Sequence, residues 1–133
     1  MDILIRPTVY QIMLAHTQAA FPLEACGLLA GQDNSVSHIY FIENILHSPV
    51  AFEMDAQQQI EVMLNSEALD LNLLAAYHSH PQGPQSPSET DIAKAYYPEM
   101  IQIIISLLDQ SSPSVRAFTI INEHVADIRL ILK

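Results

Sequence analysis

Cysteine is almost absent from this chain of 133 residues, and Cys26 is the only one. A single thiol excludes a disulfide framework within the chain, and it also excludes a zinc site built from several thiolates. Cys26 lies in an apolar stretch, where a cysteine behaves as a small hydrophobic residue. We therefore expect its thiol to be buried and unreactive rather than a nucleophile.

Basic residues are also scarce: 5 Lys and Arg face 15 Asp and Glu, which gives a formal net charge of −10. Nucleic-acid binding needs a basic face that neutralises phosphates, and five cations spread along the chain do not supply one. The same shortage disfavours binding to anionic membrane surfaces. The acidic excess favours solubility and a partner that carries a basic segment.

Long apolar runs are missing as well. No run approaches the roughly 18 to 20 apolar residues that cross a bilayer, and the start MDILIRPTVY lacks the pattern of a signal peptide. A cytoplasmic protein is therefore expected. Hydrophobic residues still make up 50% of the chain, which is enough for a core. The length suits one domain, predicted to span residues 1–133.

Hydrophobic periodicity predicts seven strands and three helices. The strands are expected at 2–5, 24–31, 36–43, 73–80, 101–108, 115–121 and 125–132. The helices are expected at 7–20, after the N-cap Asp55, and at 89–96 after the N-cap Ser88. Ile60, Met63, Leu64 and Leu71 give the second helix its apolar stripe. Interleaved helices and hairpins favour the α/β class, with a mixed β-sheet flanked by helices rather than a doubly wound parallel sheet.

Two histidines end the predicted strand 73–80. Side chains at i and i+2 point to the same face of a strand, so His78 and His80 project together, about 6 to 7 Å apart at the backbone. The loop 81–87 is long enough to bring Asp91, near the start of the next helix, against them. Two imidazoles and one carboxylate suit a catalytic zinc site, which keeps a fourth position open. The alternative is a chance grouping on a polar loop.

These residues resemble a known motif. His78-Ser79-His80-Pro81, followed by Ser88 and Asp91, is similar to the JAMM motif of the MPN-domain (JAB) metallopeptidases. The segment FPLEACGLLAG, residues 21–31, resembles the part of that family that carries an upstream glutamate. The similarity covers nearly the whole chain and looks most like the short prokaryotic members. It implies the MPN fold, a cytidine-deaminase-like α/β arrangement.

The resemblance also implies a role for each motif residue. His78, His80 and Asp91 would bind Zn2+, Glu24 would hold the attacking water and take its proton, and Ser88 would help to stabilise the oxyanion. Such chemistry is sound, because zinc lowers the pKa of bound water to about 7 and a nearby carboxylate can carry its proton to the leaving amine. Without the motif, the favoured interpretation of Glu24 is a solvated carboxylate at the end of a strand. The alternative for Ser88 is a helix N-cap with no further role.

The function implied is that of a zinc metallopeptidase. Its substrate would be a peptide or isopeptide bond at the C-terminal tail of a ubiquitin-like or sulfur-carrier protein. The chain has no room for large substrate-binding insertions, so we favour a short flexible tail, including one joined to an amino acid such as cysteine. The alternative is a non-catalytic MPN-type scaffold, although such relatives usually lack a ligand. The sequence also allows iron or manganese as the metal in place of zinc. It does not define the oligomeric state.

Two other classes of metal hydrolase do not fit this chain. Zinc deaminases need a P-C-x-x-C pair, which one cysteine does not provide. Barrel amidohydrolases need about 250 residues.

The remaining histidines are not expected to be ligands. His16 is predicted to be half-buried or on a helix surface, and His38 to face solvent. His47 and His124 are predicted to lie in loops or turns. Glu89, although close to the motif, is expected to point away from it.

Overall fold

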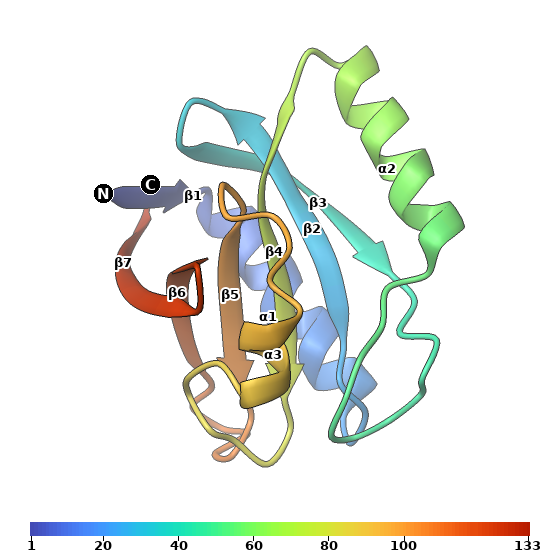
Figure 1. Ribbon diagram of the computed structural model, residues 1–133, viewed down its shortest axis with the longest axis vertical. Coiled ribbons are helices and arrows are strands. Elements are labelled where there is room, and N and C mark those ends of the chain that lie inside the picture. Colours follow the sequence, from blue (N-terminus) through green and yellow to red (C-terminus); the bar gives the residue numbers. More distant parts are fainter.

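The computed structural model describes residues 1–133, and Figure 1 shows its elements. The order is β-α-β-β-α-β-α-β-β-β, as predicted. The strands are β1 (Asp2–Ile5), β2 (Cys26–Gln32), β3 (Ser35–Ile42), β4 (Asn72–His80), β5 (Ile101–Ser106), β6 (Ser114–Ile121) and β7 (His124–Leu132). The helices are α1 (Pro7–Ala20), α2 (Ala56–Ala68) and α3 (Glu89–Ala93). None of them is long and apolar enough to span a membrane.

The strands form one mixed sheet in the order β1-β3-β2-β4-β5-β6-β7. β4 pairs with β5 in parallel, whereas β2 pairs with both β3 and β4 antiparallel. The predicted mixed sheet flanked by helices is thus confirmed. The short strand β1 also pairs in parallel with both β3 and β7, and this closes the sheet into a barrel. The closure was not predicted, because it joins segments that are far apart in sequence.

The helices cover two different faces of the sheet. In Figure 1, α1 lies behind β2 and β4, and α3 lies in front of β5 and the end of β4. The larger core lies under α1, where Val9 and Met13 pack with Tyr77 of β4. A smaller core under α2 joins Val62 to Cys26 of β2. Because side chains alternate along a strand, β4 places Tyr77 in the first core and its histidines on the face shared with α2 and α3.

The apolar stripe predicted for α2 was wrong. Ile60, Met63 and Leu64 are 51%, 55% and 63% exposed, whereas the buried residues of the helix are Val62 and Ser66. These two lie four positions apart on one face, and their small side chains let the helix approach the sheet closely. The larger residues face outward, and the helix already ends at Ala68, before the fourth member of the predicted stripe.

Three element boundaries differ from the prediction by two residues or more. β2 begins at Cys26 rather than at residue 24, since the N–H of Glu24 donates to the carbonyl of Ser48 in a loop. α3 ends at Ala93 rather than near residue 96, ahead of Pro98, which disfavours helix in the residue before it. β5 ends at Ser106 rather than at residue 108.

Candidate metal centre

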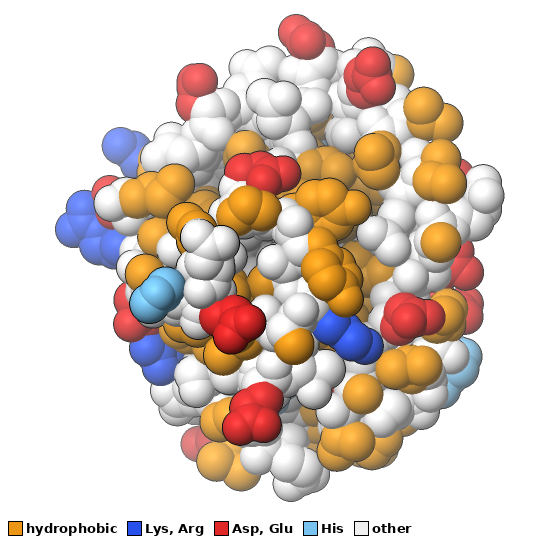
Figure 2. Space-filling model, in the orientation of Figure 1, with side chains coloured by type: hydrophobic (Ala, Val, Ile, Leu, Met, Phe, Trp, Pro, Cys, Tyr) orange, Lys and Arg blue, Asp and Glu red, His pale blue; other side chains and the backbone are white.

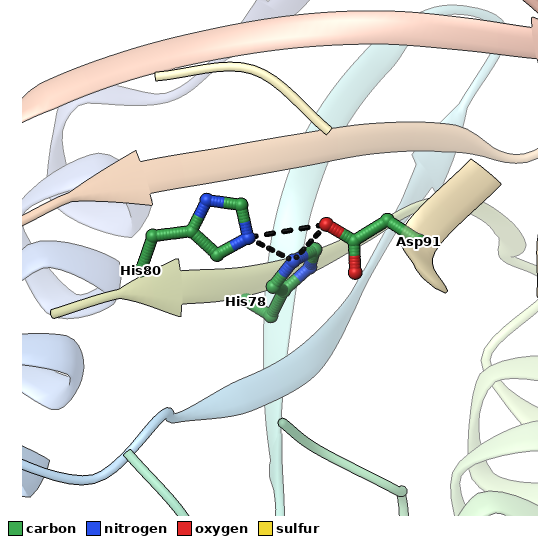
Figure 3. Close-up of side chains that lie close together, drawn as sticks. All are labelled: His78, His80 and Asp91. Carbon is green, nitrogen blue, oxygen red and sulfur yellow. Dashed lines mark hydrogen bonds and ion pairs between the residues drawn. The ribbon is translucent and has the colours of Figure 1, made fainter. Parts of the chain in front are cut away.

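His78, His80 and Asp91 point at one spot between the end of β4 and the start of α3 (Figure 3). The Nε2 atoms of the two histidines are 3.0 Å apart. Asp91 Oδ2 lies 3.2 Å from His78 Nε2 and 3.1 Å from His80 Nε2. Three side chains that the sequence predicted to meet are therefore brought together, and each offers a ligand atom to a common centre.

The N-terminus of α3 sets the orientation of the Asp91 side chain. Ser88 is the N-cap, and its Oγ accepts a hydrogen bond of 3.0 Å from the N–H of Asp91. In return, the N–H of Ser88 donates to Asp91 Oδ2 over 2.9 Å. This reciprocal capping box fixes the carboxylate, and the same oxygen faces the histidines. Ser88 uses its oxygen in the cap, so its hydroxyl hydrogen stays available.

Each histidine is held in a different way. His80 Nδ1 lies 2.9 Å from the carbonyl oxygen of Pro84, so Nδ1–H donates there and the Nε2 lone pair faces the centre. His78 is 2% exposed and stacks on Phe52, with ring centroids 4.3 Å apart. Its buried Nδ1 has no hydrogen-bond partner. Packing, rather than a second hydrogen bond, thus fixes the ring of His78.

This donor set fits a divalent metal ion. A tetrahedral centre with metal–nitrogen bonds of about 2.0 to 2.1 Å places its ligand atoms roughly 3.3 Å apart, close to the spacing found here. Burial lowers the pKa of His78 and so favours the neutral imidazole, which is the form that binds a metal. Burial opposes ionisation of Asp91, but the adjacent imidazoles of His78 and His80, together with the hydrogen bond from the N–H of Ser88, outweigh it and hold the pKa of that carboxyl well below its usual range.

Glu24 lines the same cavity from the segment just before β2. The residue is only 6% exposed, and burial is the main reason that its pKa rises from 4.5 to about 7. The charge of His80 lowers this pKa, and the charge of Asp91 raises it. A carboxyl that titrates near neutral pH can both accept and return a proton, which suits a general base.

The segment that carries Glu24 is tied to the histidine strand. The N–H of Ala25 donates to Ser79 Oγ over 2.9 Å, and the N–H of Ser79 donates to the carbonyl of Ala25 over 3.0 Å. Further along β2, Gly27 lets the strand lie close to both of its neighbours, since a Cβ there would lie 2.4 Å from the ring of Tyr77 and from the carbonyl oxygen of Tyr40. The central serine of the His-Ser-His triplet therefore has a structural task that the sequence did not reveal.

Asn44 organises the loop 44–54 and was also missed from the sequence. Its amide donates to the carbonyls of Glu24 and Ala51, over 3.1 and 3.0 Å. Its Oδ1 accepts from the N–H groups of Leu46 and Glu53, each over 3.1 Å. One buried side chain thus connects the backbone of Glu24 to the loop that carries the ring packed on His78. An asparagine at the end of a predicted strand was the only signal.

A cleft with a cavity of about 740 Å³ surrounds the centre and includes all five motif residues. Val50, Phe52 and Met63 line it from the loop 44–54 and α2, and Tyr96 and Tyr97 line it from the segment after α3. Figure 2 shows hydrophobic side chains gathered across the middle of this face. The cleft is large enough for a short extended segment of another protein.

Comparison with known proteins identifies the family. The model for prokaryotic homologs of the JAB domain matches residues 7–121. The chain belongs to this family. The family assignment confirms the resemblance found in the sequence, and the MPN fold implied by it agrees with the observed sheet and helices.

Two curated proteins and one solved structure are similar to this JAB-family chain. The CysO-cysteine peptidase of Mycobacterium tuberculosis is 30% identical over 128 residues, which cover 94% of this chain and 87% of that protein. The desampylase of Pyrococcus furiosus is 35% identical over 89 residues, 67% of this chain and 64% of that protein. The solution structure of a protein from Desulfitobacterium hafniense matches with a TM-score of 0.91 at 33% identity. The match covers 98% of this chain and 92% of that chain.

The other histidines of this JAB-family chain lie away from the centre. His16 is half-buried on α1, with Nδ1 2.6 Å from the hydroxyl of Tyr77, and His38 is exposed, as expected for both. His47 is exposed in a loop, as predicted, whereas His124 is the first residue of β7 rather than part of a turn.

Two further expectations concern Glu89 and Cys26. Glu89 is exposed and does not line the cleft, in agreement with the expectation that it points away from the motif. Cys26 is fully buried, and burial, with a smaller contribution from Glu24, raises the pKa of its thiol to about 12. The thiol is therefore inert, as expected.

Proposed function

We propose that this chain is a zinc metallopeptidase that hydrolyses a peptide or isopeptide bond at the C-terminal tail of a ubiquitin-like or sulfur-carrier protein. The observation that supports this most strongly is the convergence of two imidazole nitrogens and one carboxylate oxygen beside a buried glutamate in an open cleft. Relatives named CysO-cysteine peptidase and desampylase support the same reaction class.

In this proposal His78, His80 and Asp91 hold the metal ion. Two neutral imidazoles and one carboxylate suit zinc better than the all-oxygen sites of magnesium or calcium. Zinc supplies Lewis-acid chemistry, by which water becomes a strong nucleophile at neutral pH. Phe52 and the carbonyl of Pro84 keep the imidazoles in place.

Glu24 and Ser88 carry out the remaining steps. Glu24 takes the proton of the attacking water and then passes it to the leaving amine as the carbon–nitrogen bond breaks. The hydroxyl of Ser88 donates a hydrogen bond to the negative charge that develops on the carbonyl oxygen. Because the capping box holds Ser88 at the start of α3, this donor is oriented before substrate arrives.

The cleft accommodates the tail of the carrier in an extended form. Its hydrophobic lining from the loop 44–54 and from the segment after α3 can pack against such a tail on both sides. We further infer that residues 1–133 act as a single MPN domain, and that the protein works in the cytoplasm with a protein substrate rather than with nucleic acid or a membrane.

A cleavage assay with matched variants tests the proposal. The substrate is a ubiquitin-like carrier whose C-terminal glycine is joined to cysteine, and mass spectrometry follows release of the free tail. We expect the zinc-loaded protein to cleave it. We expect Glu24→Gln to keep its metal and lose about 10²- to 10⁴-fold in kcat, and His80→Ala to lose both metal and activity.

The same assay separates the peptidase from a non-catalytic scaffold. A scaffold would bind the carrier without releasing the tail, and Glu24→Gln would then behave like the parent protein. Normal turnover in Glu24→Gln would instead remove Glu24 from the role of base. The intact set of five motif residues favours the peptidase.

A further inference from the structure

Lys94 is the only Lys or Arg side chain that lines the cleft. It directly follows α3, and it is exposed. The other charged residues of the lining are acidic: Glu24, Glu53, Asp91 and Glu99. Apart from the proposed metal ion, Lys94 is thus the only cation in a cleft whose other charged side chains are acidic.

Lys94 makes no ion pair within the chain. Two of the other cations are paired, since Arg116 binds Asp127 at 2.7 Å and Arg129 binds Asp2 at 2.9 Å. The ammonium of Lys94 has no carboxylate within 4.0 Å, although several acidic groups line the same cavity. It is therefore free to bind an anion that enters the cleft.

Lys94 lines the same cavity as the candidate metal centre and follows Asp91 closely in the chain. It comes three residues after Asp91, and side chains three apart at a helix surface lie about 5 to 6 Å apart at Cβ. The lysine stem adds four rotatable carbons. Its ammonium can thus reach groups that project from the scissile bond when the carbonyl is held at the metal.

The chemistry of the leaving group decides which substrate such a cation would recognise. A single amino acid, joined through its α-amino group to the carrier tail, keeps a free carboxylate two bonds from the scissile nitrogen. A lysine side chain of a conjugated protein offers only a methylene group there. The glycine tail on the other side of the bond carries no charge near it.

We propose that Lys94 binds the α-carboxylate of a single amino acid attached to the carrier tail, and so selects amino-acid adducts over lysine-linked protein conjugates. This inference rests on the proposed function and deepens it. Lys94 offsets the repulsion that Glu53 and Glu99 would exert on that carboxylate. A hydrogen bond between charged groups in a partly exposed site is expected to change kcat/KM about tenfold.

Two substrates that differ in one group test this assignment. One is the carrier joined to cysteine, and the other is the same carrier joined to cysteinamide, in which a carboxamide replaces the carboxylate. We expect the parent protein to prefer the carboxylate about tenfold in kcat/KM. Lys94→Gln should abolish the preference by slowing only the cysteine adduct, and Lys94→Arg should retain it.

The control is the other lysine of the chain, Lys133, which is exposed and does not line the cleft. Lys133→Gln should leave both rates unchanged, and all variants are compared at equal metal content. As a readout without turnover, calorimetry on Glu24→Gln should show about tenfold tighter binding of the cysteine adduct than of the amide, lost when Lys94→Gln is added.

Three results would overturn the inference. Equal cleavage of both adducts by the parent protein would mean that no carboxylate is recognised, while the proposed peptidase function would stand. Equal slowing of both adducts in Lys94→Gln would mean that Lys94 contacts the body of the carrier instead. Cleavage of neither adduct by the metal-loaded protein would remove the peptidase function and the inference together.

Discussion

Glu24 shows how position alone prepares an ordinary carboxyl group for catalysis. It is held by backbone hydrogen bonds to Ser48 and from the side chain of Asn44, and it is nearly covered by protein. Burial disfavours its charged form and raises its pKa to about 7. The residue therefore exchanges protons at the pH where a peptidase works, which a solvated glutamate would not do.

The raised pKa of Glu24 lowers the free energy of unfolding at neutral and higher pH, and this effect can be measured. Since the folded pKa of about 7 exceeds the ordinary value of 4.5, the folded state binds the proton more tightly. The free energy of unfolding should therefore fall as pH rises from about 4.5 to 7. Glu24→Gln cannot ionise, so in metal-free protein at pH 8 we expect it to be about 1 to 2 kcal/mol more stable than the parent, allowing for solvent screening.

Urea unfolding of both metal-free proteins at pH 4.5 and pH 8 makes this comparison. The stability difference should be present at pH 8 and should largely vanish at pH 4.5, where the parent residue is protonated in the folded state. A difference of the same size at both pH values would show that the substitution acts through packing rather than through ionisation.

At the level of elements, α2 shows where periodicity misleads. Its large apolar residues recur at helical spacing, yet they face outward, and Val62 and Ser66 face the sheet. One side of the helix borders the cleft, so an apolar residue such as Met63 can be kept there for a partner rather than for the core. The sequence pattern does not distinguish these two uses.

A matched pair of substitutions tests the observed orientation of α2. Val62 is 7% exposed and Leu64 is 63% exposed. Val62→Ala should lower the free energy of unfolding by about 1 to 2 kcal/mol, because it opens a cavity over Cys26. Leu64→Ala should change it by less than about 0.5 kcal/mol. Urea denaturation gives both values, and a larger loss for Leu64→Ala would mean that the predicted stripe faces the core after all.

Other features were predictable because their signals are local. β4 ends in two histidines at strand spacing, and α3 begins with a serine three residues before an aspartate, so their meeting required only a turn between them. Asn44, Phe52 and Lys94 gave no such signal. Their importance comes from contacts that the folded loop and cleft create, and single residues of these types are common in any sequence.

On the scale of the whole molecule, closure of the sheet joins its first and last strands. β1 joins β3 to β7, and Arg129 near the C-terminus pairs with Asp2 near the N-terminus. The strand with the histidines is paired on both sides, with β2, which follows Glu24, and with β5. The positions of Glu24 and the histidines are thus set by the sheet, whereas the cleft is shaped by loops and short helices around it.

The metal content of the protein, purified without chelator or affinity-tag metal, tests the central claim most directly. Elemental analysis should find about one zinc ion per chain in the parent and in Glu24→Gln, and essentially none in His80→Ala. Protein that holds no zinc, even after incubation with zinc and desalting, would contradict the metallopeptidase and leave the non-catalytic scaffold as the better description.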